Sequence, residues 1–154
     1  MMVNTRRFGL IEINEDQVIT FIGPVLGFET LKKYAFVSTG EDRQPFEFLQ
    51  AIEDENLTFI VTDPFVFFKD YEFQLDKHWT EALDVHREED IQVMVIVTVR
   101  SPEDITCNLR APIVINRTKR VAAQVILEQG SYPTKQPLLG GKKGADADVN
   151  PVSK

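Results

Sequence analysis

The residues that could act as acids, bases or metal ligands are few and lie far apart in the sequence. His78 and His86 flank a predicted helix, outside any metal-ligand spacing, so we expect both to be exposed surface histidines. Asp63, Asp70 and Glu72 could form a set of catalytic carboxylates, but an aspartate directly before a proline, as at position 63, commonly forms a turn. These residues do not predict an active site.

A single cysteine and a glycine-containing loop also lack the neighbouring residues that a reactive site would need. Cys107 is the single cysteine, so it has no partner for an internal disulfide or a zinc pair, and we expect a structural thiol in a reducing compartment. The stretch GPVLG at residues 23–27 has glycines but neither a following Lys-Ser/Thr pair nor a G-x-G-x-x-G pattern, so it does not predict a phosphate-binding loop. We therefore expect no metal site, no cofactor and no enzymatic activity.

Length and composition indicate one folded domain, residues 1–137. The chain has 154 residues, of which 43% are hydrophobic and eleven are phenylalanine, enough for a substantial core. It has no apolar run of about 18 residues and no secretory signal, so we expect a soluble cytoplasmic protein that does not contact a membrane. Residues 138–154 are rich in Gly, Lys and Asp without periodicity, which predicts a disordered tail.

Charge is unevenly distributed along the chain, whose net charge is −7. Residues 41–104 hold 17 Asp and Glu against 5 Lys and Arg, a net charge of −12, whereas residues 105–120 hold four basic residues and no acidic one. An acidic surface repels phosphate groups, so nucleic acid is not expected as a direct partner. A basic protein, including one that itself binds RNA, would be attracted to it.

Apolar patterns predict a mostly β chain. Residues 91–99 form a nearly continuous β-branched run, typical of a central strand covered on both faces. A hairpin is predicted for 46–52 and 57–62, and another for the two strands within 10–22 around the turn at 14–16. Further strands are predicted at 34–38, 71–75, 112–116 and 121–127. We expect a single-domain, antiparallel β-barrel-like or sandwich fold with one or two short helices.

The two helix candidates are short. Residues 27–34 begin at a glycine and end near two lysines, which suits the helix dipole. In residues 76–85, Trp79 and Leu83 lie four apart and Asp76 is placed to cap the first turn.

Aromatic residues are concentrated beside acidic ones in PFVFFKDYEF, residues 64–73. One face of one strand cannot bury five aromatic rings in ten residues, so we expect Phe65, Phe68 and Tyr71 at the surface and Phe67 and Phe73 in the core. Aromatic residues surrounded by charge are typical of protein–protein hot spots.

The segment TCNLRAPIVIN, residues 106–116, is predicted to form a pair of strands with turns. Pro112 lacks an N–H group and is expected at the start or edge of a strand, while Asn108 and Asn116 can close turns through their side chains. We expect a mainly architectural role here, with a recognition surface nearby.

Four segments in register resemble the flagellar assembly factor FliW family. They are FIGPVLGFE (21–29), PFEFLQAIEDENLTFIVTDPFVFFKDYEFQL (45–75), TCNLRAPIVIN (106–116) and AAQVIL (122–127). The resemblance implies a non-enzymatic cytoplasmic protein that binds newly made flagellin and CsrA, an RNA-binding translational repressor. It further implies that the free protein sequesters CsrA and that accumulating flagellin releases it.

Aromatic and charged residues near these segments are the candidates for partner binding, and the alternatives remain open. The candidates are Phe65, Phe68, Asp70, Tyr71, Glu72, Glu53, Asp54, Glu55, Asn108 and Arg110. We expect the free protein to be a monomer. A β-barrel that binds a small ligand would instead contain an apolar pocket, and a structural subunit would form a stable homo-oligomer.

Overall fold

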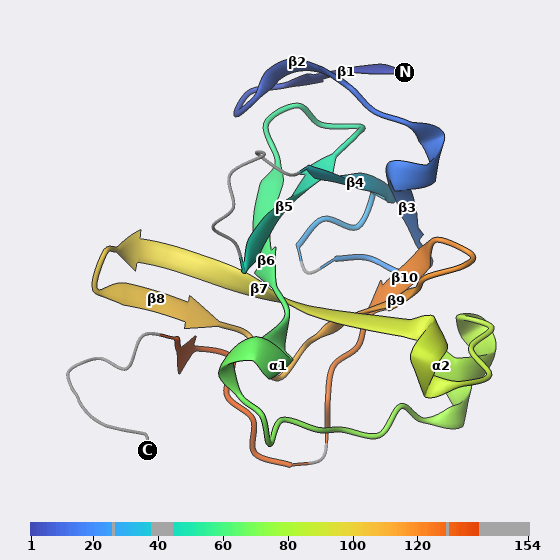
Figure 1. Ribbon diagram of the computed structural model, residues 1–154, viewed down its shortest axis with the longest axis vertical. Helices are drawn as coiled ribbons and strands as arrows, with labels where there is room; N and C mark the ends of the chain where they lie inside the picture. Colours follow the sequence, from blue (N-terminus) through green and yellow to red (C-terminus); the bar gives the residue numbers. More distant parts are fainter. Residues whose placement is uncertain (26, 38–44, 129, 139–154) are drawn as a thin grey trace.

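A computed structural model describes residues 1–25, 27–37, 45–128 and 130–138, and β-strands dominate it (Figure 1). Most strands belong to one curled sheet: β3 (Val18–Phe21), β4 (Lys33–Val37), β5 (Phe46–Ala51), β6 (Thr58–Thr62), β7 (Ile91–Ser101), β8 (Asp104–Cys107), β9 (Ile113–Asn116), β10 (Val121–Gln124) and β11 (Gln136–Pro137). A separate hairpin contains β1 (Met2–Thr5) and β2 (Gly9–Glu12). The helical elements are α1 (Pro64–Phe67), α2 (Lys77–Ala82) and 3-10 turns at Glu15–Gln17 and Glu88–Asp90.

Strand β7 closes the sheet into a ring because it is long enough to pair with three other strands. Its residues 91–94 pair with β9, residues 95–97 with β6, and residues 97–101 with β8. From β6 the ring continues through β5, β4, β3 and β10 to β9. The barrel-like prediction is confirmed, with one departure: β3 and β10 are parallel, and Thr20 aligns with Val121. Beyond the ring, β7 and β8 project as a two-stranded arm (Figure 1).

Apolar side chains fill the inside of this ring. In β9, Ile113 and Ile115 belong to the same buried cluster as Phe21 and Tyr34, while Val114 belongs to a cluster on the other face. Strand β9 is thus buried on both faces, which explains its three consecutive apolar residues. Each fully buried aliphatic side chain of this kind contributes about 1.5–3 kcal/mol to stability.

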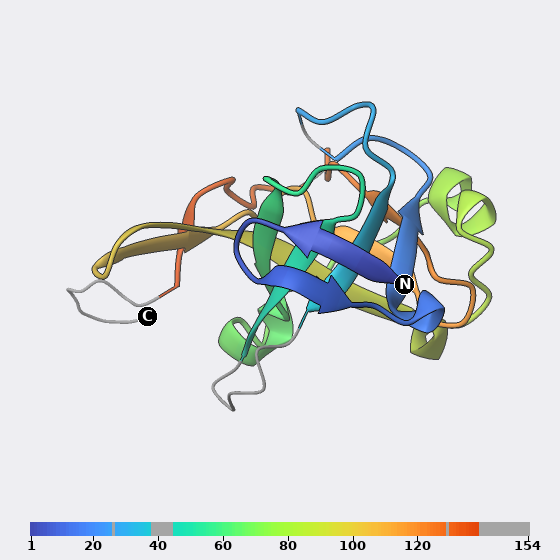
Figure 2. The ribbon, with the colours of Figure 1, turned by 90° about the horizontal axis from the view of Figure 1, so that it is seen from above.

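Three elements cover the outside of the ring, and each has an apolar cluster beneath it. The β1–β2 hairpin lies across the ring (Figure 2), and Val3 packs in a cluster with Ala35. Leu83, directly after α2, packs with Val114. The region of α1 packs around Val95 of β7. The core is therefore layered, with one cluster inside the ring and three outside.

The predicted hairpin within residues 10–22 is wrong. Strand β2 pairs with the N-terminal strand β1, so that Leu10 aligns with Asn4, whereas β3 pairs with β4 and β10. Between β2 and β3, the backbone amide of Gln17 donates to the Asn14 carbonyl at 2.9 Å, and the Gln17 side chain accepts from the Asn14 amide at 2.7 Å. These bonds form a 3-10 turn, which directs the two strands into different sheets.

The predicted helix over residues 27–34 is also wrong. Gly27 adopts a φ of +83° in a turn, and the Phe28 ring then packs edge-on against Phe59 with centroids 5.7 Å apart. Lys33 already begins β4 and aligns with Thr20. Helix propensity over eight residues is weak compared with strand pairing and burial of an aromatic ring.

Residues 71–75 are not a strand, although their burial alternates as predicted. Tyr71 is buried and Phe73 and Leu75 are half-buried, whereas the two polar residues between them are exposed. Helix α1 turns the chain away from the sheet after β6. The segment therefore crosses the outside of the ring and packs its apolar side chains into the clusters there.

Several local predictions are confirmed. Strands β5 and β6 form a hairpin, and β9 pairs with β10. Asp76 caps α2, because its carboxylate accepts from the Trp79 amide at 3.2 Å. Strand β9 begins directly after Pro112.

The predicted boundary between domain and tail needs a small correction. Leu138 is only 9% exposed, and its amide donates to the Ile105 carbonyl at 2.9 Å. Position 138 therefore belongs to the folded domain. The predicted tail from position 139 onward lies outside the described residues.

Candidate functional site

Exposed apolar side chains gather at α1, directly after β6. Asp63 caps this short helix by accepting from the Phe65 amide at 2.9 Å, and a proline at its first position suits a helix start. Phe65 and Val66 are 42% and 58% exposed, and Phe68 is half-buried. We call Phe65, Val66 and Phe68 the α1 patch. Exposed aromatic and aliphatic groups held on a capped helix suit a protein-binding surface.

Tyr71 is not part of that surface, contrary to the sequence-based expectation. Its side chain is 4% exposed, and its ring packs edge-on against Tyr132 with centroids 4.7 Å apart. Its hydroxyl donates to the Leu109 carbonyl at 2.7 Å, and burial raises the pKa of Tyr71. The ring lies 5.8 Å from Phe65, so Tyr71 supports the α1 patch from below.

The turn at residues 108–111 lies on the other side of Tyr71. The Asn108 side-chain oxygen accepts from the amides of Arg110 and Ala111, both at 3.0 Å, which confirms that Asn108 closes a turn. Arg110 is exposed. Because Tyr71 bonds to Leu109 within this turn, the structure brings the α1 patch and the turn together.

Asp70 and Glu72 flank Tyr71 in the sequence, and both are exposed. The amide of Glu72 donates to the Tyr132 hydroxyl at 3.1 Å, which fixes the backbone and directs the carboxylate toward solvent. Exposed charged residues, Lys69, Asp70 and Glu72, therefore follow the α1 patch in the sequence. Tyr132 was not singled out in the sequence, because nothing in its neighbourhood marks a contact 60 residues away.

The acidic turn, Glu53–Asp54–Glu55, lies between β5 and β6, at the opposite end of β6 from α1 (Figure 1). The Glu53 carboxylate accepts from the amides of Lys32 and Lys33 at 2.8 and 3.2 Å, and these bonds hold its pKa below the ordinary value. The five residues of β6 put roughly 20 Å between the acidic turn and the α1 patch. The candidate residues therefore form two surfaces and not one.

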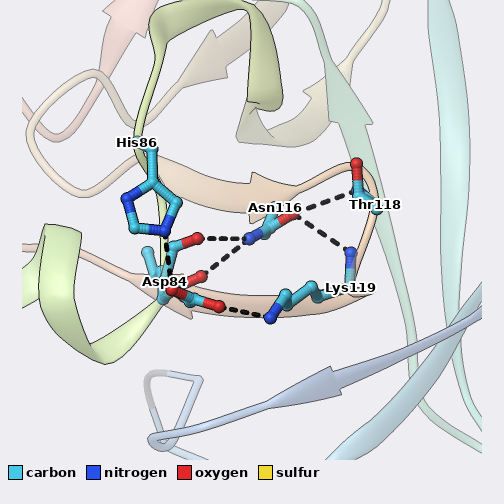
Figure 3. Close-up of polar contacts among 6 residues, drawn as sticks. Asp84, His86, Asn116, Thr118 and Lys119 are labelled. Atoms are coloured by element: carbon cyan, nitrogen blue, oxygen red, sulfur yellow. Dashed lines mark hydrogen bonds and ion pairs between the residues drawn. The ribbon is translucent and has the colours of Figure 1, made fainter.

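A polar cluster joins the end of α2 to the β9–β10 turn (Figure 3). The buried Asn116 side chain donates to the carbonyls of Leu83 and Asp84 at 2.8 and 3.1 Å, and accepts from the amides of Thr118 and Lys119 at 3.0 and 3.1 Å. The predicted turn-closing role of Asn116 is confirmed, and its bridge to α2 is additional.

Asp84 connects the same cluster to charged side chains. It has a positive φ of 57°, and its carboxylate contacts the ammonium group of Lys119 and, at 3.0 Å, the His86 ring (Figure 3). The Lys119 contact, followed by His86, lowers the pKa of Asp84. All three side chains are at least partly exposed, and the one aspartate contacts both the lysine and the histidine. At the surface, these contacts help to hold the β9–β10 turn against the end of α2.

The two histidines and the single cysteine lie in different environments. His78 and His86 are exposed, as predicted. Cys107 is buried, and burial raises its pKa to about 12, so the reactive thiolate form is scarce at neutral pH. Within the described residues, no cluster of His, Cys, Asp and Glu could hold a metal ion. Nor does any described helix have the length and apolar character needed to cross a bilayer.

Known proteins are similar to this chain in sequence and in fold. Residues 2–138 match the family model described as FliW protein. The chain belongs to the FliW family. It is 48% identical over 141 residues to the flagellar assembly factor FliW of Bacillus licheniformis, covering 91% of this chain and 98% of that protein. The Bacillus subtilis protein of the same name is 43% identical, again covering 91% and 98%.

A crystal structure of the flagellar assembly factor FliW has the same fold. It superposes with a TM-score of 0.84 at 38% identity, covering 92% of this chain and 99% of that one. The FliW match ends at residue 138, which is buried. The family match therefore covers residues 2–138 of this chain.

Proposed function

We propose that this protein is a non-enzymatic, cytoplasmic regulator of flagellum assembly that binds flagellin and the translational repressor CsrA in turn. Its curated relatives are named flagellar assembly factors. The observation that carries the proposal is the separation of two unlike surfaces on one ring: the apolar α1 patch and the acidic turn. An apolar patch suits an amphipathic segment of flagellin, and an acidic turn suits a basic RNA-binding protein.

The distance between these surfaces supports exclusive binding. A standard interface covers about 800 Å² on each partner, which corresponds to a footprint roughly 30 Å across. Two such footprints whose centres lie roughly 20 Å apart along β6 overlap. Flagellin and CsrA would therefore exclude one another by direct contact, and no change in the ring is needed.

Filling of the ring argues against the alternative of a small-ligand barrel. Phe21, Tyr34 and Leu49 are at most 1% exposed and occupy its interior. A ligand-binding barrel instead keeps a cavity of about 300–1,000 Å³. The remaining alternative, a structural subunit, predicts a stable homo-oligomer, whereas the regulator is expected to elute as a monomer in size-exclusion chromatography.

The α1 patch is tested by Phe65→Ala in calorimetric titrations with flagellin monomer. Truncation of an exposed hot-spot aromatic should weaken binding by about 1–3 kcal/mol while the melting temperature stays close to that of the wild type. Val99→Ala is the matched control, because Val99 is 51% exposed on the β7–β8 arm, away from α1. Equal effects of the two variants, or none from Phe65→Ala, would remove the α1 patch from the flagellin site.

The acidic turn is tested by association kinetics with CsrA. Glu55→Lys should slow association and flatten its salt dependence, because the carboxylate is exposed and forms no ion pair among the described residues. Glu89→Lys makes the same change in net charge at another exposed position. Unchanged kinetics for Glu55→Lys would contradict steering by this turn, and a ternary complex with unreduced affinities would contradict partner exchange.

A further inference from the structure

A groove with a volume of about 280 Å³ lies between the β1–β2 turn and the β5–β6 turn. It is lined by Arg6, Arg7, Asn56 and Thr58. The Arg6 amide donates to the Glu55 carbonyl at 2.8 Å, which holds the two turns side by side, as Figures 1 and 2 also show. The groove is therefore built by two hairpins that this bond joins, and it borders the acidic turn, because Asn56 directly follows Glu55.

The groove is lined by two positive charges that have no acidic partner among the described residues. Neither Arg6 nor Arg7 forms a salt bridge with any described carboxylate, and neither guanidinium donates a hydrogen bond to a described residue. The Arg7 guanidinium lies 5.0 Å from the centroid of the Phe48 ring, and the Phe8 ring packs edge-on against Phe48 at 5.2 Å. Stacking restricts the Arg7 side chain, which lowers the entropy lost when a ligand binds.

None of the described carboxylates of the nearby acidic turn forms an ion pair with these arginines. The Glu53 carboxylate accepts from the amides of Lys32 and Lys33, and the Asp54 carboxylate accepts from the Asn56 amide at 2.9 Å. These two carboxylates thus bind backbone groups, and the exposed Glu55 carboxylate forms no ion pair with a described residue. The guanidinium groups remain available to an anion that enters the groove.

We propose that this groove binds the carboxylate of an acidic side chain from a partner polypeptide. A guanidinium presents two parallel N–H groups that match a carboxylate, and the Asn56 side chain lies in the same lining. The site extends the function proposed above, since neither the α1 patch nor the acidic turn attracts an acidic segment.

Backbone contacts argue against free phosphate as the natural occupant. Phosphate sites usually use several unpaired backbone N–H groups. Here the Arg6 amide is bonded to Glu55, the Phe8 amide to the Thr5 hydroxyl at 2.8 Å, and the Asn56 amide to Asp54. Two of the amides at the groove, those of Arg6 and Asn56, are therefore already bonded, and a phosphate site with several free amides is not formed here.

The test is an NMR titration of the full chain with a blocked Glu-Glu peptide at low ionic strength. The arginine Nε–H signals of Arg6 and Arg7 and the Asn56 side-chain amide should shift and saturate. Arg6→Gln and Arg7→Gln should each weaken binding about fivefold or more, a change of about 1 kcal/mol. Arg100→Gln, an exposed arginine on the β7–β8 arm, is the matched control and should leave binding unchanged.

Parallel titrations with a blocked Gln-Gln peptide and with inorganic phosphate identify the ligand chemistry. The neutral peptide should cause no saturable shift. Saturation by phosphate but not by the acidic peptide would overturn the proposal, as would an equal loss of binding in Arg100→Gln. Arg6 makes no packing contact like that of Arg7 with Phe48, so Arg6→Gln still tests the site if Arg7→Gln is less stable.

Discussion

The Tyr71 hydroxyl donates a 2.7 Å hydrogen bond to the backbone carbonyl of Leu109, 38 residues further along the chain. This bond ties the segment after α1 to the turn that precedes β9. It lies beneath Phe65, so the position of the α1 patch depends on it. Tyr71 therefore affects partner binding through the fold and not through contact.

Tyr71→Phe should lower stability while binding by the folded fraction is retained. The change leaves the Leu109 carbonyl without its partner in a buried position, which costs about 1–3 kcal/mol. The free energy of unfolding in urea is the measurement. Tyr132→Phe is the control, because its hydroxyl accepts only a longer bond, 3.1 Å, from the Glu72 amide at the surface. A larger loss in Tyr132→Phe would contradict the role assigned to Tyr71.

Asn116→Ala should be more damaging than a typical polar substitution. The side chain is 2% exposed and makes four hydrogen bonds to backbone groups of α2's end and of the β9–β10 turn. Its loss leaves buried donors and acceptors unpaired, at a cost of about 2–4 kcal/mol. Urea denaturation of Asn116→Ala and of the exposed control Asn56→Ala measures the difference. A loss below about 1 kcal/mol would show that water replaces the side chain.

Glu53→Gln should reveal a stability contribution that depends on pH. Two backbone amides hold the Glu53 pKa below its ordinary value of 4.5, so the folded state favours the ionised form. The contribution is present above that value and is lost as the pH falls through the lowered pKa. Thermal melts of wild type and Glu53→Gln should therefore differ at about pH 7 and converge in acid.

Glu55→Gln serves as the control for that pH series. It removes the same charge from the same turn without touching a backbone amide through its carboxylate. Its melting curve should follow the wild type across the series. A gap between Glu53→Gln and wild type that widens in acid would contradict a lowered Glu53 pKa in the folded state.

Two truncations should place the end of the domain at Leu138. A chain that ends at Leu138 should melt close to the full-length protein, because the removed residues are rich in Gly, Lys and Asp. A chain that ends at Pro137 loses a buried leucine side chain and the amide bonded to Ile105, which should cost about 2–3 kcal/mol. Equal melting temperatures for the two truncations would contradict the docking of Leu138.

Local chemistry made part of the fold predictable. The cap of α2 by Asp76, the β5–β6 hairpin and the turn closed by Asn108 depend on residues close together in the sequence, so their signals are visible there. The mostly β fold follows from the many apolar segments. The predicted hairpin within residues 10–22 was wrong, because the choice between β1 and β3 as the partner of β2 depends on packing across the whole ring.

The candidate surfaces were predictable in composition but not in arrangement. The excess of aromatic residues correctly predicted that Phe65 is exposed, but the same argument wrongly predicted an exposed Tyr71. The sequence could not show that Tyr71 is buried, because its partner Leu109 is remote in sequence. The negative charge of the acidic turn could be predicted from the sequence, but the hydrogen bonds that Glu53 accepts from the amides of Lys32 and Lys33 could not. Arg6 and Arg7 carry no local signal of a groove, since the other wall comes from β5–β6.

The parallel pairing of β3 with β10 also sets when this protein can fold during its own synthesis. Thr20 aligns with Val121, so the ring stays open until nearly the whole domain has left the ribosome. Closing so long a loop carries an entropic cost that only the completed core offsets. Strands synthesised earlier therefore keep unpaired edges for a time. Strand β3, for example, can pair only with β4 until β10 has been synthesised. The ring therefore cannot close before β10 has been made, late in the synthesis of the domain.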